Sequence, residues 1–170
     1  MATPQIRPAG PIAPFLWFDG RAEEAAAFYA TLFEDSGIDE VARYPEAGQE
    51  VHGQAAGTAM TVRFHLAGQP FVALNGGPQF AFTEAVSFMV TCETQDDLDA
   101  LWDRLTEGGD PAAQQCGWCK DRFGVSWQVV PAGLGRILGD PDPGRAARAT
   151  TAMLAMKKLD VAELERAAAR

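Results

Sequence analysis

Two cysteines, Cys116 and Cys119, form the sequence CGWC and are the most conspicuous chemical groups in the chain. A C-x-x-C pair can carry out redox chemistry when its first thiol lies at a helix N-terminus, which lowers the pKa of that thiol. Here the pair lies in a turn that leads into a predicted β-strand, and residues three apart on a strand point to opposite faces. A structural zinc site needs two such pairs, and Cys92 is the only other thiol. We therefore expect the pair to pack within a hairpin, while one thiol could face a pocket.

The other polar residues do not assemble a catalytic pair. His65 lies on the polar side of a predicted strand, beside Arg63, which favours surface or cross-strand pairing. His52 lies near Glu50 in a Gly/Glu-rich loop that could fold over a pocket as a lid, although the pattern favours an ordinary solvated loop. Ser87 has no histidine on a neighbouring predicted strand face, so a nucleophilic triad is not supported. The acidic clusters at 35–40 and 96–99 are typical of solvated turns and helix starts rather than of general acid–base pairs.

The elements that must position these residues begin with a strand, a helix and a series of strands. An apolar run is followed by a helix with one apolar face and then by alternating strands. The predicted ranges are 15–18 (strand), 21–33 (helix), and 37–44, 59–66 and 70–74 (strands). Asp19 is expected to cap the helix, and the stretch 45–58 predicts a mobile loop.

The same order begins again at Ala85. An alternating strand is predicted over 85–92. A helix follows, with a start signal at Thr94 and Asp97 and an end signal at Gly108 and Gly109. A hairpin is predicted at 114–131. Two such modules predict an α+β fold, in which the paired modules form an incompletely closed, mostly antiparallel barrel with helices outside and a concave face inside. Because the helix-covered face of each sheet must be apolar, the opposite face is the predicted ligand face.

We expect three segments along the chain. Its prolines make 1–14 an extended N-terminal arm, the two modules occupy 15–78 and 84–131 within a domain of 15–131, and a helical extension follows at 132–170. Asp160 with Glu163 predicts a helix start in this extension. The apolar residues of the extension need a surface to pack on, either their own barrel or a second subunit, and we favour a homodimer.

Composition limits the partners. The chain has a net charge of −9 and no visible basic patch, so neither nucleic acid nor an anionic membrane is an expected partner. No apolar run approaches about 18 residues, the length that spans a bilayer, and the N-terminus lacks the apolar core of a secretory signal. An odd number of cysteines, 3, suits free thiols in a reducing cytoplasm.

Four stretches carry a family resemblance: PFLWFDGRAEEAAAFY, GQPFVALNGGPQF, EAVSFMVTCETQDDLDALW and QQCGWCKDRFGVSWQVVP. They resemble the vicinal oxygen chelate superfamily, the glyoxalase and bleomycin-resistance fold, and within it the PhnB-like branch, often described as 3-demethylubiquinone-9 3-methyltransferase-like. The tail from DPDP to AMKKLD is also similar to that branch. The resemblance implies paired βαβββ modules and, commonly, a dimer. Methyl transfer is not expected, because the chain has no Gly-rich strand-to-helix turn for an adenosine cofactor.

The resemblance also implies where a metal ion would lie, because enzymes of this superfamily usually hold one divalent ion with His, Glu or Gln from four strands. The matching positions in this chain are Phe15 and Trp17, Asn75, Ala85 with Ser87, and Gln128. The amide of Gln128 thus stands where a glutamate is usual. Apolar and neutral groups dominate where a dication needs carboxylates or imidazoles. We therefore expect no metal ligands and no cofactor.

The predicted ligand face is neutral and partly aromatic. It contains Trp17, Ala73, Asn75, Ser87, Met89 and Gln128, with Gln115 or Trp118. Such a surface suits an uncharged or ring-bearing small molecule, although the same residues could fill the barrel without a ligand. The sequence thus predicts a metal-free small-molecule binding protein. It leaves open a metal-dependent lyase, isomerase or dioxygenase with an atypical site, and a redox or regulatory protein that uses its C-x-x-C thiols.

Overall fold

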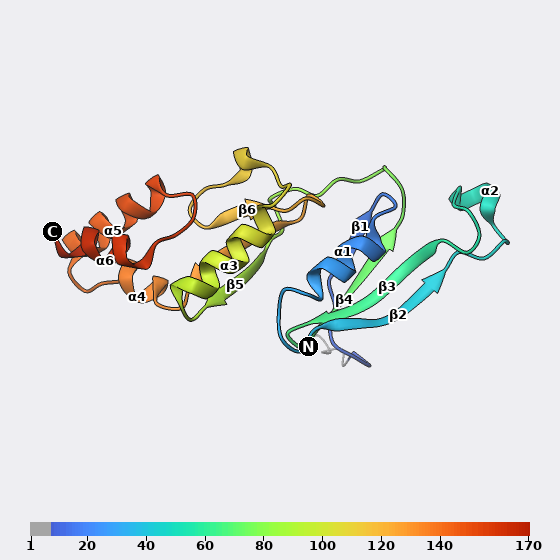
Figure 1. Ribbon diagram of the computed structural model, residues 1–170, viewed down its shortest axis with the longest axis horizontal. Coiled ribbons are helices and arrows are strands. Elements are labelled where there is room, and N and C mark those ends of the chain that lie inside the picture. The colour runs from blue at the N-terminus through green and yellow to red at the C-terminus, as the bar shows by residue number, and fades with distance from the viewer. Residues whose placement is uncertain (1–7) are drawn as a thin grey trace, which may run out of the picture. The chain divides into compact units, whose positions relative to one another are not determined.

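The chain folds into two compact units in the computed structural model, which describes residues 8–170 (Figure 1). The first unit ends at Ala81 and the second runs from Phe82 to Arg170. Residues 8–14 form neither helix nor strand, and the rest of the predicted N-terminal arm lies outside the described residues.

The first unit is a four-stranded sheet with a helix on one face. Its elements are β1 (Phe15–Phe18), α1 (Ala22–Tyr29), β2 (Gly37–Arg43), α2 (Gln49–His52), β3 (Ala59–Leu66) and β4 (Gln69–Asn75). The strand order is β1-β4-β3-β2, and β1 runs parallel to β4 while the other neighbours are antiparallel. This is the predicted βαβββ order, with the short helix α2 inside the stretch predicted to be a loop.

Alternation along the strands gives this sheet one buried and one open face. β3 buries Val62, Phe64 and Leu66 on the side of α1, and the residues between them face the other way. Tyr29 of α1 stacks on Phe64 with ring centroids 6.3 Å apart, and Phe64 stacks on Phe71 of β4 at 5.3 Å. This aromatic stack forms the centre of the unit's core and holds α1 on the sheet.

The second unit repeats this plan around a three-stranded sheet. Its elements are β5 (Phe88–Cys92), α3 (Gln95–Thr106), the 3₁₀ turn η1 (Pro111–Ala113), β6 (Trp118–Lys120) and β7 (Ser126–Pro131). The order is β5-β7-β6, with β5 parallel and β6 antiparallel to β7. Between α3 and β6 the chain forms η1 and an isolated bridge from Gln115 to Trp118 instead of a further strand. Within the described residues this module therefore has one strand fewer than the predicted βαβββ.

Helix α3 begins and ends where the sequence predicts. The Asp97 backbone N–H donates to Thr94 Oγ1 at 3.1 Å, so the predicted N-cap is confirmed. Beyond its C-terminal end, Gly109 passes close to β6, and a Cβ atom on Gly109 would lie 2.1 Å from the carbonyl oxygen of Lys120. Only glycine permits this approach, which fixes the end of the helix against the sheet.

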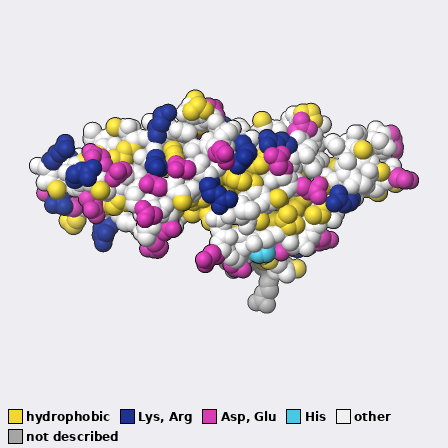
Figure 2. All heavy atoms as spheres, in the orientation of Figure 1, with side chains coloured by type: hydrophobic (Ala, Val, Ile, Leu, Met, Phe, Trp, Pro, Cys, Tyr) yellow, Lys and Arg dark blue, Asp and Glu magenta, His cyan; other side chains and the backbone are white. Residues whose placement is uncertain are grey.

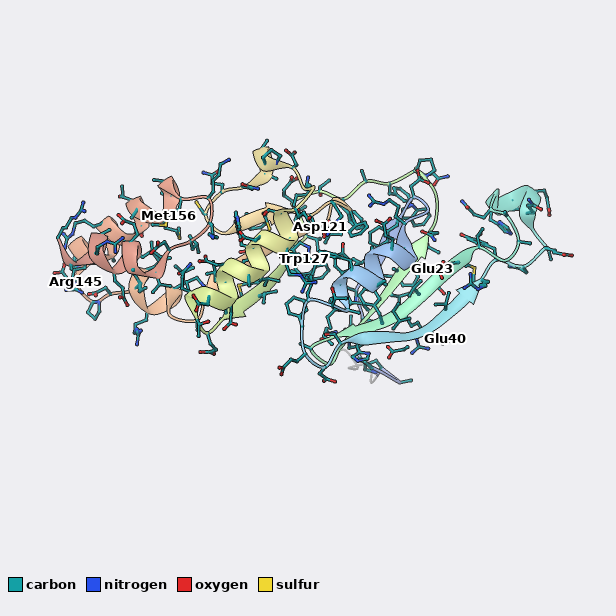
Figure 3. The ribbon with its side chains drawn as sticks, in the orientation of Figure 1. Glu23, Glu40, Asp121, Trp127, Arg145 and Met156 are labelled. Atoms are coloured by element: carbon teal, nitrogen blue, oxygen red, sulfur yellow. The ribbon has the colours of Figure 1, made fainter. Side chains whose placement is uncertain are left out.

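The turn between β6 and β7 is built around a buried carboxylate, Asp121, which is 2% exposed. Its Oδ1 accepts hydrogen bonds from the backbone N–H groups of Phe123 (2.8 Å) and Val125 (3.0 Å), and its Oδ2 accepts one from Trp127 Nε1 at 2.8 Å (Figure 3). Charge-assisted bonds of this kind are stronger than neutral ones. They therefore hold both strands of the hairpin in a single register.

The C-terminal extension consists of α4 (Leu134–Leu138), α5 (Pro143–Ala155) and α6 (Val161–Ala169). These helices pack on one another through a buried cluster of Ile137, Ala149, Leu164 and Ala168. Glu163 N donates to Asp160 Oδ1 at 2.8 Å, which confirms the predicted start of the last helix. On the face shown in Figure 2, acidic and basic side chains are interspersed over these helices.

The extension is tied to its own module by the segment between α5 and α6. The carbonyl oxygens of Met156 and Lys157 accept hydrogen bonds from the N–H groups of Cys116 (2.9 Å) and Gly117 (2.8 Å). Gln95 of α3 also bonds to the backbone at the start of α6 at 3.0 Å. The sequence allowed the extension to pack on its own module or on a second subunit, and these hydrogen bonds join it to its own module. The homodimer stays a prediction.

The predicted α+β class is confirmed, with two separate sheets, a helix on each, and a helical extension. Neither sheet closes on itself into a barrel within the described residues. Within residues 8–170, no helix has the length and apolar character needed to cross a membrane.

Candidate functional site

The open face of the second sheet brings together four of the predicted ligand residues. Trp118 lies opposite Gln128 in the β6–β7 pair, and Gln128 lies beside Met89 in the β5–β7 pair. Gln128 Nε2 donates to the hydroxyl of Ser87, which immediately precedes β5, at 2.9 Å. Met89 is 63% exposed, so it presents its thioether to solvent. These four residues, called the neutral face below, form one continuous surface on the sheet.

The residues of the neutral face can be derived from the opposite face of the sheet, on which α3 packs. Phe88, Trp127 and Cys119 are cross-strand neighbours, and the last two are almost completely buried. The rings of Phe88 and Trp127 lie 5.5 Å apart, and α3 packs against all three strands. Since side chains alternate along a strand, the next residues on each strand must point away from α3. These are Met89, Gln128 and Trp118.

A hollow of about 510 Å³ lies beside the neutral face. It is mostly apolar and is lined by Glu84, Ala112, Ala113, Gln115, Cys116 and Trp118. Trp118 thus belongs to both the neutral face and the hollow, and the predicted residue Gln115 lies in the hollow. Sequence reasoning missed the contribution of η1, although Asp110 before Pro111 is a capping signal that could have revealed it; Asp110 Oδ1 accepts from Ala112 N at 2.8 Å.

Charged and hydroxyl groups lie next to this hollow on the same face of the sheet. Lys120 Nζ lies 2.5 Å from Glu84 Oε1, and this hydrogen bond lowers the pKa of the Glu84 carboxyl. Ser126 lies directly opposite Lys120 across the β6–β7 pair. The Ser126 hydroxyl oxygen is fully buried and has no hydrogen-bond partner among residues 8–170. Sequence reasoning did not single out any of these three residues.

In the first unit, Trp17 lies on the face opposite α1 and is held by the turn after β4. Its Nε1 donates to the carbonyl oxygen of Gly77 at 2.8 Å, and its ring meets Phe80 edge-on with centroids 4.9 Å apart. A Cβ atom on Gly76 would lie 2.2 Å from the indole ring, so the ring packs directly on backbone. The indole therefore uses its donor within the fold and offers a ligand mainly its remaining ring surface.

Asn75 and Ala73 differ from the prediction, because the register of β4 places them on the α1 side of the sheet with Phe71. Asn75 Oδ1 accepts from the backbone N–H of Ala22 at 2.8 Å, and Asn75 Nδ2 donates to the carbonyl oxygen of Ala59 at 3.0 Å. Asn75 thus caps the start of α1 and ties it to β3. The sequence prediction that Asp19 would cap this helix is accordingly corrected, since the helix cap comes from a residue distant in sequence.

The three cysteines differ in how deeply they are buried. Cys119 packs under the sheet, where burial raises the pKa of its thiol to about 12, with a further contribution from the Asp121 charge. Burial also raises the pKa of the Cys92 thiol. Cys116 is half-buried and lines the hollow. All three thiols are free, and the expected packing of the C-x-x-C pair within the hairpin is met at Cys119.

Both histidines belong to the first unit. His65 Nδ1 lies 2.8 Å from Asp39 Oδ1 of β2, which is the cross-strand pairing that the sequence predicted. His52 packs its ring on Tyr44, with centroids 4.6 Å apart, and its Nδ1 accepts from Gln54 N at 3.1 Å. The His65–Asp39 pair is partly exposed at the surface of the first unit, and neither histidine lines the hollow beside Trp118.

The residues at the positions implied for a metal ion do not suit one. Asn75 has committed both ends of its amide to backbone groups, and Gln128 and Ser87 are bonded to each other. The other matching positions are apolar or aromatic, whereas divalent ions select carboxylates and imidazoles. Among residues 8–170, no three His, Cys, Asp or Glu side chains are grouped as metal ligands.

Two successive modules, each with a helix on one face of its sheet and an open opposite face, define the class of protein. This is the glyoxalase and bleomycin-resistance fold of the vicinal oxygen chelate superfamily. The profile of the family described as 3-demethylubiquinone-9 3-methyltransferase matches residues 11–130, and the chain belongs to this family, the PhnB-like branch of the superfamily.

Solved structures agree with this assignment. The PhnB protein from Bacillus cereus, whose name carries the same methyltransferase description, is 37% identical, with a TM-score of 0.62 over 72% of this chain and 100% of its own. A protein from Pseudomonas aeruginosa is 20% identical, with a TM-score of 0.54 over 72% of this chain and 98% of its own, which shows the fold alone. No curated protein matches the chain at a significant level.

Proposed function

We propose that this chain is a small-molecule binding protein that works without a metal ion and takes an uncharged or aromatic ligand. The observation that carries the proposal is the neutral face, in which the Gln128–Ser87 pair lies between Met89 and Trp118. An amide and a hydroxyl can orient a ligand through hydrogen bonds, while a thioether and an indole supply apolar contact. Gln115 belongs to the same proposed site through the hollow.

The two remaining predicted residues have different places in this proposal. Trp17 is a separate candidate contact on the open face of the first unit. Asn75 is assigned to the scaffold, because its amide already caps α1. Methyl transfer has no support in the described residues, since neither sheet has the parallel, doubly wound order that typically binds an adenosine cofactor.

Thermal-shift measurements with neutral aromatic compounds test the proposal, with indole and 4-phenylbutanamide as probes. We expect a concentration-dependent rise in Tm, accompanied by NMR shifts at the Trp118 indole. Replacing Trp118 or Gln128 with alanine should remove the rise, whereas Leu154→Ala, an exposed change on α5, should preserve it. If no neutral aromatic compound stabilises the protein or shifts open-face resonances, the proposal is wrong. The metal-dependent alternative would instead be favoured if Mn²⁺, Ni²⁺ or Zn²⁺ raises Tm and both probes bind only when that ion is present.

We also propose a cytoplasmic homodimer. The three free thiols support a reducing compartment, and the family resemblance supports dimerisation. Light scattering after size-exclusion chromatography should give about twice the chain mass of 18.2 kDa. A mass equal to that of one chain at micromolar concentration would exclude the dimer.

A further inference from the structure

An enclosed lysine beside the hollow is neutralised by a carboxylate from an exposed turn. The side chain of Lys120 is only 20% exposed, whereas that of Glu84, its ion-pair partner, is 57% exposed. Glu84 lies in the turn that precedes β5 and belongs to no helix or strand. A largely covered lysine side chain is stabilised by an anionic partner, and among residues 8–170 the ion pair found for Lys120 is the one with Glu84. The partner comes from a segment that a ligand could displace.

The same carboxylate lies at the wall of the hollow. Glu84 lines it together with Trp118, Ala112 and Ala113, and the lining is mostly apolar. A molecule in this hollow would therefore lie against an indole and two methyl groups, with the Lys120–Glu84 pair at its edge. Apolar surroundings with one charged group at the rim suit a compact amphipathic molecule.

Ser126 adds a hydrogen-bond donor without an acceptor. Its hydroxyl lies on the same sheet face as Lys120 and directly opposite it, is fully buried, and has no partner among the described residues. Buried hydroxyls are nearly always hydrogen-bonded, so such a group calls for an explanation. The Glu84 carboxylate on Lys120 does not accept from this hydroxyl, so Ser126 leaves a polar group without a described partner on the face of the sheet that carries Lys120.

We infer that Glu84 occupies the place of a ligand carboxylate: a small aromatic monocarboxylate exchanges with Glu84 on Lys120, and its apolar body fills the hollow beside Trp118. The exchange preserves one ion pair and adds the burial of the aromatic body. Because the net charge of the chain is −9, Lys120 selects the anion locally rather than through the field of the whole protein. This inference rests on the proposed function and narrows its ligand to the aromatic class with one acidic group.

Two matched probes, 4-phenylbutyrate and 4-phenylbutanamide, test the inference by isothermal titration calorimetry on the full chain. The acid should bind about tenfold more tightly than the amide, because a charge-assisted hydrogen bond replaces a neutral one. Glu84→Gln removes the competing carboxylate and should raise the affinity for the acid several-fold. Lys120→Met should abolish the preference for the acid. Glu107→Gln, which breaks the exposed pair with Arg122 elsewhere in this unit, is the control and should change nothing.

The outcomes separate the inference from the proposed function. If the acid and the amide bind equally, or if Glu84→Gln does not raise the affinity for the acid, the inference is overturned while small-molecule binding stands. If neither the two probes nor the neutral compounds bind at all, both are overturned. Circular dichroism verifies that each variant folds. If Lys120→Met does not fold, the affinity of Glu84→Gln for the acid tests the inference by itself.

Discussion

Replacing Asn75 with alanine tests whether this residue belongs to the scaffold rather than to the ligand site. Its Oδ1 accepts from Ala22 N at 2.8 Å and its Nδ2 donates to Ala59 O at 3.0 Å. Ala22 and Ala59 are 0% and 3% exposed. The variant therefore leaves one N–H group and one carbonyl group buried without these partners, at the point where α1, β3 and β4 meet.

The expected loss of stability follows from those two groups. A buried polar group that loses its partner costs about 1–3 kcal/mol, so Asn75→Ala should lower the free energy of unfolding by about 4 kcal/mol. That is a large part of the roughly 5–15 kcal/mol that typically stabilises a domain. Gln128→Ala is the matched control, since its partner Ser87 is only half-buried, and it should cost less than about 1 kcal/mol.

Urea denaturation followed by far-UV circular dichroism measures both changes, and titration with 4-phenylbutanamide measures binding. We expect opposite profiles: Asn75→Ala is unstable but still binds when folded, and Gln128→Ala is stable but binds weakly. A loss below about 1 kcal/mol for Asn75→Ala would refute the capping role, because two orphaned buried groups cannot cost so little. Loss of binding by folded Asn75→Ala would instead return this residue to the ligand site.

Three further predictions concern the second unit. Asp121→Ala removes the acceptor of three hydrogen bonds. It should lower the free energy of unfolding, measured by urea denaturation, by about 3–5 kcal/mol. A loss below about 1 kcal/mol would contradict the role of Asp121 in holding the hairpin. Cys119, with its pKa raised to about 12, should resist iodoacetamide at pH 8 while Cys116 is modified first, as peptide mass spectrometry would show; the reverse order would contradict this. Hydrogen bonds from the N-terminal N–H groups of α5 lower the pKa of Asp142, so the stability from this cap is present above the usual pKa of 3.8 and is lost as pH falls through the lowered value. Thermal melts should therefore show Asp142→Ala less stable than the parent at pH 7 and progressively similar to it in acid; a difference that persists at the lowest pH would be contrary evidence.

Features that depend on neighbouring residues were predictable. The caps at Thr94 and Asp160 depend on side chains three residues from the N–H groups that they bind. The open-face position of Gln128 could also be predicted, because alternation in a strand with one covered face leaves one choice of side. The place of Asn75 could not, because β4 is apolar on both faces: Phe71 and Ala73 share the face of Asn75, and Val72 and Leu74 lie on the other.

The sequence by itself determined the α+β class, the strand–helix–strand start of each module and the side of its strand on which Gln128 lies, because periodicity and capping act over a few residues. The tertiary structure decided which distant groups meet. The amide that caps α1 comes from a residue 53 positions away, and the carboxylate on Lys120 comes from a turn before β5. The hollow beside Trp118 likewise depends on how η1 packs beside β6, because Ala112 and Ala113 of η1 line it. Such contacts depend on how separate elements pack, and no local pattern in the chain encodes them.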